Sequence, residues 1–290
     1  MSNQARRITV DTKLIALLGN PLRQSVSYLT QNQVYEELGL DYCYFPVELP
    51  RADQLESVIA GFREMNFAGF AVTKPYKEQV LPYLDRLDST AEKMGACNTV
   101  VVEDGCLVGY NTDGIGCTRS LREERGFDPA GSRVFSYGAG GAARAVLFQL
   151  ASEGAKQITV AALDGMGQRL AGDLNRCYPG LCQGIDISQR DILASETSQA
   201  DLVLNLTGLG MAPHLNETPA DPTWLRPGQL CYDAIYNPEK TRFLEDAERA
   251  GCQTLNGLGM VIYQGLAQIE LWTGVWAEAE IMYRALNGAG

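Results

Sequence analysis

The sequence predicts an α/β protein of two domains. The chain has 290 residues, of which 46 % are hydrophobic, and this length is sufficient for two buried cores. Short apolar runs bounded by turn residues alternate with helical patterns in both halves, as in layered α/β proteins. A turn-rich stretch, Phe127–Gly131, separates the halves and precedes a glycine-rich junction between a strand and a helix. We therefore expect a domain boundary near this stretch.

The first half begins with an expected buried strand at Lys13–Leu18, because the turn residues Gly19–Pro21 end this apolar run. After a later strand, Pro75 is expected in the first turn of a helix, which puts Thr73 and Lys77 at a strand-to-helix junction. The other expected elements are helix Gln31–Leu38, strand Tyr42–Val47, helix Leu55–Met65, strand Gly69–Val72, a helix start in Asp85–Glu92, strands within Gly95–Val102 and Leu107–Tyr110, and helix Ile115–Arg125.

The second half opens on the sequence VFSYGAGGAARA, a strand end followed by Gly138, Gly140 and Ala143 in the spacing G-x-G-x-x-A. The first glycine permits a tight turn, the second lets the backbone approach a pyrophosphate, and the alanine allows close helix packing. The next strand ends at Asp164, roughly twenty residues later, where a carboxylate meets an adenosine ribose in dinucleotide-binding domains. We interpret the segment as a Rossmann-type dinucleotide site, with a glycine-rich structural turn as the alternative.

The remaining pattern continues as alternating strands and helices. We assign 113–257 to the dinucleotide-binding domain, and 1–112 with 258–290 to a discontinuous α/β substrate domain. The expected elements are helix Ala145–Ala151, strand Gln157–Ala162, helix Leu170–Arg176, strands Asp201–Leu206 and Leu230–Ile235, helix Phe243–Ala250, strand Gln253–Leu255, and a helical tail Val261–Ala285 with Gly274 as its breaking point.

Composition excludes several classes of partner. The net charge is −11 and no basic tract appears, which argues against nucleic acids and anionic membranes. No 18-residue apolar run exists and the first residues, MSNQARRITVDTK, lack an apolar signal core, so we expect a cytoplasmic protein without a membrane partner. Eight cysteines without a C-x-x-C pair and a single histidine argue against a metal site or a disulfide framework.

Three short polar stretches have two interpretations each. Ser25 and Ser27 can hold a substrate carboxylate or hydroxyl, or Ser27 or Thr30 can simply cap the next helix. Lys77 is either a functional cation or a solvated lysine, although first turns favour acidic residues. Asp113, after Asn111 and Thr112, is either a functional carboxylate or a helix cap.

Considered together, these motifs resemble the quinate/shikimate dehydrogenase family from about Gly19 to Trp272. The motifs occur in family order: Ser25–Ser27, Val72–Lys77, Gly95–Thr99, Gly109–Gly114, Gly138–Ala142, Asp233–Thr241 and Gly257–Gln264. The resemblance implies reversible hydride transfer between a nicotinamide and shikimate, giving 3-dehydroshikimate. It implies Lys77 and Asp113 as the catalytic acid–base pair, with Lys77 supplying a proton and positive charge to the developing alkoxide.

The resemblance also assigns binding residues. The partner is a small cyclic polyol carboxylate, and we expect a monomer or homodimer. The implied substrate contacts are Ser25, Ser27, Thr73, Lys77, Asn98, Asp113, Tyr236 and Gln264. The implied cofactor contacts are Gly138, Ala139, Gly140, Gly141, Ala142, Asp164, Thr207, Ala234 and Gly257.

Departures from the family pattern affect substrate and cofactor choice. The first motif has Gln24 and Tyr28 in place of the usual His and Pro, and Gln31 replaces another common His. Ala71, two residues before Thr73, replaces the usual Asn, and Lys74, directly after it, replaces the usual Val. Quinate or a modified shikimate therefore stays open, as does a catalytically silent protein that binds a dinucleotide or cyclitol. A folate or glutamate-type dehydrogenase would share the glycine motif only.

The residues after the second strand of the dinucleotide domain bear on the cofactor. Asp164-Gly165-Met166 stands where members that use NADP commonly have Asn-Arg-Thr. A carboxylate there accepts hydrogen bonds from a free ribose hydroxyl and repels a phosphate, so NAD is favoured, with NADP possible. Arg169 is the nearby cation.

Overall fold

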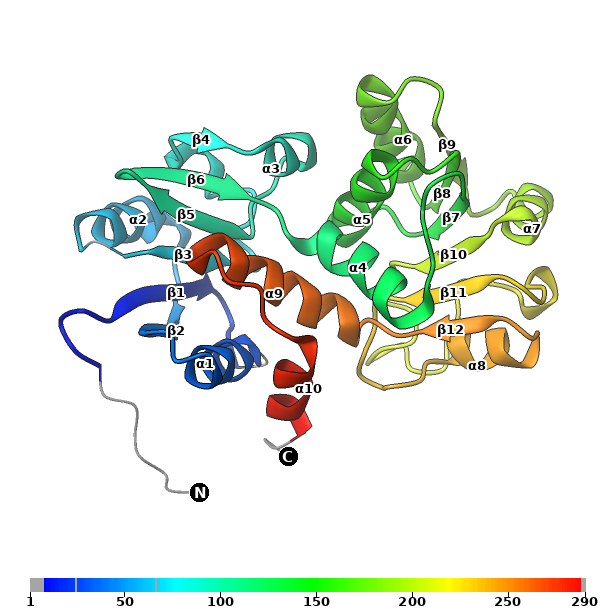
Figure 1. Ribbon diagram of the computed structural model, residues 1–290. Coiled ribbons are helices and arrows are strands. Elements are labelled where there is room, and N and C mark those ends of the chain that lie inside the picture. Colours follow the sequence, from blue (N-terminus) through cyan, green and yellow to red (C-terminus); the bar gives the residue numbers. More distant parts are fainter. Residues whose placement is uncertain (1–7, 24, 66, 288–290) are drawn as a thin grey trace. The chain divides into compact units, whose positions relative to one another are not determined.

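The computed structural model describes residues 8–23, 25–65 and 67–287. It divides into two compact units: the first holds the chain up to Thr112 and again from Gly265, and the second holds Asp113–Gln264. Each unit contains one sheet of six described strands with helices around it (Figure 1). The predicted α/β class is confirmed.

The expected return to the first domain at residue 258 differs from the observed division, which falls after Gln264, inside helix α9 (Leu258–Thr273). The reason is close packing between α9 and helix α4 (Asp113–Arg125). A Cβ built on Gly116 would lie 2.8 Å from the Cβ of Gln264, so the start of α9 contacts the second unit.

The sheet of the first unit has the strand order β2-β1-β3-β5-β6-β4. Strands β2, β1 and β3 are parallel, and β5 and β6 are antiparallel neighbours that follow β3. Its elements are β1 (Lys13–Gly19), α1 (Ser27–Glu37), β2 (Tyr42–Glu48), α2 (Leu55–Glu64), β3 (Gly69–Val72), β4 (Arg86–Leu87), α3 (Ser89–Met94), β5 (Thr99–Glu103), β6 (Cys106–Tyr110), the end of α9, and α10 (Ala279–Asn287).

The core of the first unit gathers apolar side chains of the strands and α2, with Phe62, Phe67 and Phe70 in ring contact. β3 is buried at all four positions because it lies inside the sheet, which explains its continuous apolar sequence.

The predicted helical tail is divided into two helices. Helix α9 ends at Thr273, and Gly274 takes φ 71° before α10, so the break lies at the expected glycine.

The sheet of the second unit is parallel throughout, with the order β12-β11-β10-β7-β8-β9. This order is that of a Rossmann-type dinucleotide-binding fold. Its elements are α4, β7 (Arg133–Tyr137), α5 (Gly141–Ser152), β8 (Gln157–Ala162), α6 (Met166–Cys177), β9 (Cys182–Asp186), α7 (Arg190–Gln199), β10 (Leu202–Asn205), η3 (Pro222–Trp224), β11 (Leu230–Asp233), α8 (Arg242–Arg249), β12 (Gln253–Leu255) and the start of α9.

The expected helix after Gly69–Val72 is wrong. The chain makes a series of turns from Lys74 to Val80, and the Lys74–Pro75 peptide bond is cis. Long-range contacts hold this segment: the Tyr76 hydroxyl donates to the Leu49 carbonyl at 2.6 Å, and the Lys77 carbonyl accepts from the Cys97 amide at 2.7 Å. Tertiary contacts therefore override the local proline signal.

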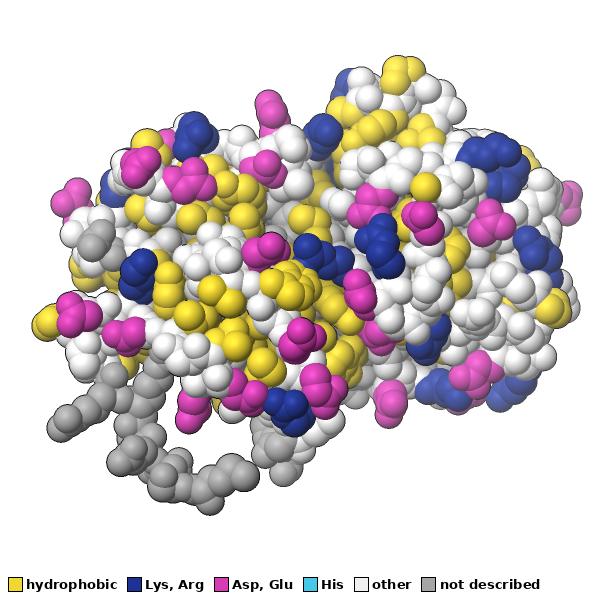
Figure 2. All heavy atoms as spheres, in the orientation of Figure 1, with side chains coloured by type: hydrophobic (Ala, Val, Ile, Leu, Met, Phe, Trp, Pro, Cys, Tyr) yellow, Lys and Arg dark blue, Asp and Glu magenta, His cyan; other side chains and the backbone are white. Residues whose placement is uncertain are grey.

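Positively and negatively charged side chains are mixed on the surface. On the face drawn in Figure 2, Lys and Arg side chains lie scattered among Asp and Glu side chains. None of the helices in the described residues is both long and apolar enough to cross a bilayer. Within the same residues, no group of three or more His, Cys, Asp or Glu side chains is placed to hold a metal ion.

Candidate active site

The predicted substrate residues of the first unit share one edge of its sheet. Ser25 and Ser27 follow the end of β1, and Thr73 and Lys77 follow the end of the parallel strand β3. Asn98 immediately precedes β5, which runs antiparallel to β3 and therefore starts at the same edge. The topology thus collects hydroxyl, amide and ammonium groups from segments distant in sequence.

The two serines form a small hydroxyl cluster. The Oγ atoms of Ser25 and Ser27 are 2.9 Å apart, and the Tyr44 hydroxyl on β2 donates to Ser27 Oγ at 3.5 Å. The residue before α1, Val26, makes no side-chain cap, so neither serine is used as the helix cap that the alternative interpretation required. Both are half-buried, while burial raises the pKa of Tyr44 and keeps its proton as a donor. Sequence reasoning missed Tyr44.

The residues that depart from the family pattern have different surroundings. Gln24 lies outside the described residues. Tyr28 and Lys74 are exposed, whereas Ala71 is buried within β3. Gln31 is fully buried, and its Nε2 donates to Gln268 Oε1 at 3.0 Å, so this position joins α1 to α9 within the first unit.

Asn98 is 2 % exposed, and its side chain is hydrogen-bonded to nearby residues. Its Oδ1 accepts from the Thr112 amide at 2.9 Å and the Thr99 hydroxyl at 2.7 Å, and its Nδ2 donates to Thr112 Oγ1 at 3.0 Å. Gln268 donates to the Asn98 carbonyl at 3.2 Å. The observed contacts give Asn98 a structural task, namely fixing Thr112, and its substrate contact stays a prediction.

Lys77 and Asp113 belong to different units, and each is described within its own. Lys77 is half-buried, and its carbonyl accepts from the Cys97 amide, directly before Asn98. Asp113 is the first residue of α4 and follows Thr112 in the chain. The N-terminal position stabilises a carboxylate through the positive end of the helix dipole.

Polar side chains at the ends of β10 and β11 hold two loops of the second unit. Asn205 Nδ2 donates to the Leu209 carbonyl at 2.9 Å and to Asp233 Oδ2 at 3.0 Å, while Asn205 Oδ1 accepts from the Thr207 hydroxyl at 2.6 Å. Asp233 also accepts from the Thr241 hydroxyl at 2.6 Å. Burial raises the pKa of Asp233, partly offset by these hydrogen bonds. Neither Asn205 nor Asp233 was recognised from the sequence as a loop anchor.

Replacing Thr241 by valine is expected to lower the free energy of unfolding by about 2–3 kcal/mol. The change keeps the side-chain shape but removes the donor to buried Asp233 and the acceptor that caps α8. Urea unfolding at neutral pH measures the loss. Thr254→Val is the control, because its hydroxyl makes an exposed hydrogen bond to Glu248, and we expect less than about 0.5 kcal/mol there. Equal losses would contradict the anchoring role.

The loop between β7 and α5 fits a pyrophosphate. Gly138 has φ 103°, and a Cβ there would lie 2.6 Å from the Leu206 carbonyl oxygen, so only glycine is tolerated. A Cβ on Gly140 or Gly141 would meet nothing within 4 Å, which marks open space over the loop. The residue before α5, Gly140, provides no side-chain cap, so the first amides of this helix face that space as anion donors.

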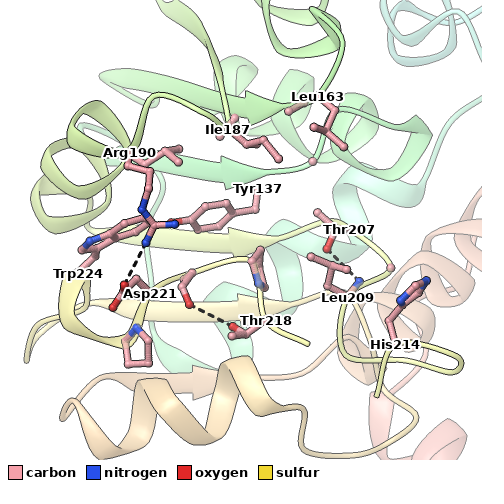
Figure 3. A pocket seen from close by; sticks show the side chains of 18 residues that line it. Tyr137, Leu163, Ile187, Arg190, Thr207, Leu209, His214, Thr218, Asp221 and Trp224 are labelled. Carbon is pink, nitrogen blue, oxygen red and sulfur yellow. Dashed lines mark hydrogen bonds and ion pairs between the residues drawn. The ribbon is translucent and has the colours of Figure 1, made fainter. Parts of the chain in front are cut away.

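A cavity of about 690 Å³ lies outside the carboxyl ends of β7, β8 and β10 (Figure 3). Two predicted cofactor residues, Gly138 and Thr207, line it. Its volume is typical of small-molecule sites, which occupy roughly 300–1,000 Å³. Ile187, Arg190 and Trp224 also line it, and sequence reasoning missed them because β9, α7 and η3 were not predicted.

The other predicted cofactor residues lie at the carboxyl ends of the strands. Ala139 and Ala142 belong to the β7–α5 segment, and Asp164 follows β8. Ala234 follows β11, and the Gly257 amide after β12 donates to the Ile235 carbonyl at 3.1 Å. A Cβ on Gly257 would clash with the Ala234 carbonyl, so glycine permits this approach.

The two remaining predicted substrate residues also belong to the second unit. Tyr236 is 41 % exposed in the loop after β11. Gln264 lies on α9 and donates to the Val261 carbonyl at 3.1 Å.

Comparison with known proteins gives consistent matches over nearly the whole chain. The model of the shikimate dehydrogenase substrate binding domain matches residues 17–100, and that of the shikimate 5'-dehydrogenase C-terminal domain matches residues 257–286. A relative from Moorella thermoacetica, named shikimate dehydrogenase (NADP(+)), is 45 % identical over 98 % of this chain and 95 % of its own. This chain belongs to the shikimate dehydrogenase family.

Solved structures of the family agree with this membership. The crystal structure of shikimate 5-dehydrogenase from Listeria monocytogenes, in complex with shikimate and NAD, superposes with a TM-score of 0.93 at 39 % identity. The alignment covers 97 % of this chain and 98 % of that one. Quinate dehydrogenase from Corynebacterium glutamicum, in complex with NAD, gives a TM-score of 0.87 at 30 % identity, covering 96 % and 99 %.

The predicted preference for NAD is wrong. The curated shikimate dehydrogenase relatives are named for NADP(+), including those at 39 % identity. The structure shows how near to this turn the cation named in the sequence analysis lies. A Cβ built on Gly165 would lie 3.3 Å from Nη1 of Arg169, so this guanidinium lies against the turn that carries Asp164. A cation beside the turn offsets the repulsion by Asp164, to which the prediction gave the greater weight.

Proposed function

We propose that this protein oxidises shikimate to 3-dehydroshikimate, reversibly, with NADP(H) as the cofactor. The main support is the single sheet edge of the first unit, where Ser25, Ser27, Thr73 and Lys77 follow neighbouring strand ends. The names of the relatives supply the substrate and cofactor class. The nicotinamide, when bound, supplies or accepts the hydride.

Lys77 and Asp113 are the proposed acid–base residues. In the reducing direction the carbonyl oxygen of the substrate gains negative charge as the hydride reaches the carbon. The Lys77 ammonium stabilises this charge and gives its proton to the oxygen, and it takes the proton back in the oxidising direction. Asp113 accepts a hydrogen bond from the reacting hydroxyl.

The other polar residues orient the ring. Ser25 and Ser27 hold the substrate carboxylate with neutral donors, supported by the Tyr44 hydroxyl. Thr73, Asn98, Tyr236 and Gln264 are the proposed partners of the ring hydroxyls. In the second unit the β7–α5 loop holds the pyrophosphate, and Asp164, Thr207, Ala234 and Gly257 line the cofactor path.

A substrate panel tests the function. Shikimate and quinate are each incubated with NADP⁺ or NAD⁺, and reduced nicotinamide is followed by its absorbance. We expect the highest kcat/KM for shikimate with NADP⁺. A higher value for quinate would assign the chain to the related quinate activity, and binding of NADP⁺ without turnover of either acid would support the silent binding protein.

Replacing Arg169 by glutamine is expected to raise the KM for NADP⁺ at least about tenfold, because a charge-assisted contact to the 2′-phosphate is lost. The KM for NAD⁺ should change less than about twofold, since that cofactor has no phosphate there. Arg176→Gln, also on α6 and 76 % exposed at its side chain, is the control. Equal changes for both cofactors would show that Arg169 does not read the phosphate.

A further inference from the structure

One end of the cavity in the second unit carries an ion pair on an aromatic ring. Nη2 of Arg190, the first residue of α7, lies 3.3 Å from Oδ2 of Asp221. The Arg190 guanidinium carbon lies 5.1 Å from the ring centroid of Trp224. Figure 3 shows Arg190 and Trp224 side by side with Asp221 beneath the guanidinium. The ring and the carboxylate together fix the orientation of the arginine.

The walls beside this pair are apolar. Leu163 after β8 and Ile187 after β9 line the cavity, although they are 57 % and 40 % exposed. Tyr137 on β7 lines the cavity while remaining 2 % exposed, and its hydroxyl is bonded to Thr197. Exposed apolar side chains around a polar pair are suited to a flat heteroaromatic ring, whose faces are apolar and whose edge is polar.

The position of the cavity relates this end to the dinucleotide. Its lining begins at Gly138 in the phosphate loop and passes the ends of β8 and β9 before it reaches Arg190. Dinucleotides lie outside the carboxyl ends of the strands in this fold, with the adenosine ribose at the end of the second strand. The base is the part of the adenosine half farthest from the pyrophosphate, so the end of the cavity at Arg190, whose side chain is 69 % exposed, is available to it.

The donors and acceptors of the pair match adenine. Asp221 Oδ1 accepts from the amide and the hydroxyl of Thr223, at 3.1 and 2.7 Å, while Oδ2 faces Arg190. Within the described part of the chain, the Arg190 guanidinium bonds only to Asp221, so further N–H groups remain for a ligand. Adenine presents an amino donor beside ring nitrogen acceptors, which complements a carboxylate beside a guanidinium.

We propose that the Arg190–Asp221 pair recognises the adenine base of the cofactor, with Asp221 accepting from the amino group and Arg190 donating to a ring nitrogen. The proposal rests on the dinucleotide site of the proposed function. It makes the pair a determinant of base specificity. Hypoxanthine carries a carbonyl oxygen where adenine carries the amino group, so Asp221 would face an acceptor and repel it.

Equilibrium binding without substrate tests the proposal. Titration calorimetry compares NADP⁺ with nicotinamide hypoxanthine dinucleotide phosphate, which differs only in the base. The wild-type protein should bind NADP⁺ at least about tenfold more tightly. In Asp221→Asn the amide can donate to the hypoxanthine carbonyl and still cap η3, so the ratio should fall below about threefold.

Two matched controls separate recognition from general effects. Asp191→Asn removes the same charge from the neighbouring exposed residue of α7 and should keep the wild-type ratio. Arg190→Met should weaken NADP⁺ binding at least about fivefold, whereas Arg249→Met, on α8 with a 70 % exposed side chain, should change it less than about twofold. Circular dichroism confirms that each variant is folded.

The outcomes distinguish this proposal from the proposed function. A wild-type ratio near one, or an unchanged ratio in Asp221→Asn, overturns base recognition while NADP⁺ binding and shikimate oxidation still stand. Absence of NADP⁺ binding to the wild-type protein overturns both. A ratio of the two affinities that falls in Asp221→Asn and keeps its wild-type value in Asp191→Asn supports recognition of the base by the pair.

Discussion

Replacing Lys77 by alanine is expected to lower kcat for shikimate oxidation at least about 100-fold, the usual scale for losing a positioned acid or base. The KM for shikimate should change much less, because the serines and the other proposed partners of the substrate remain. Initial rates at saturating NADP⁺ measure both constants. The reason for the large effect is that the proposed source of the proton and of the positive charge at the reacting oxygen is removed.

Lys93→Ala is the control for this variant, since Lys93 is an exposed lysine of α3 in the same unit. Its kcat should stay within about twofold of wild type, as is usual for exposed positions. Turnover of Lys77→Ala near the wild-type rate on the best substrate would remove Lys77 from the catalytic pair.

Replacing Asp113 by asparagine is expected to lower kcat by a similar factor, at least about 100-fold. The amide keeps the shape and one acceptor oxygen but loses the negative charge, so the hydrogen bond that it accepts from the reacting hydroxyl is weaker. Initial rates at saturating NADP⁺ measure the loss.

Asp128→Asn is the matched control, because Asp128 is exposed in the segment before β7 and bonds only locally to the Ala130 amide among the described contacts. Its rate should match wild type. If Asp113→Asn kept the wild-type rate, the carboxylate would have no part in proton transfer.

The second unit could be predicted well from the sequence because its signals are local. The glycine spacing, the strand before it and the helix after it are contiguous, and β7, Gly138 and α5 follow that order. By contrast, β9 reads CQGID, with only two of its five residues fully buried, so an apolar pattern is missing at this sheet edge. Without β9 and α7, the end of the cavity at Arg190 could not be anticipated.

The first unit shows where secondary-structure prediction from neighbouring residues fails. Pro75 signals a helix start, yet contacts of Tyr76 with Leu49 and of Lys77 with Cys97 hold turns instead. Those partners lie about 20 or more residues away in sequence, beyond the reach of any window-based pattern. Motif order nevertheless selected Lys77 and the serines as candidates. The topology brings the strand ends that they follow to one edge of the sheet.

The cofactor error has a similar origin. The prediction weighted the repulsion by Asp164 above the nearby cation Arg169, whereas helix α6 brings Arg169 back to the same turn. A charge one helical turn away in sequence is adjacent in space, so the local electrostatics depend on the helix as well as on the motif.

The most direct test of the proposed activity is product identification with the wild-type protein, shikimate and NADP⁺. We expect one NADPH formed for each shikimate consumed, and mass spectrometry should find a product lighter by two hydrogens that matches 3-dehydroshikimate. NADP⁺ that binds but is never reduced by shikimate would contradict the proposal.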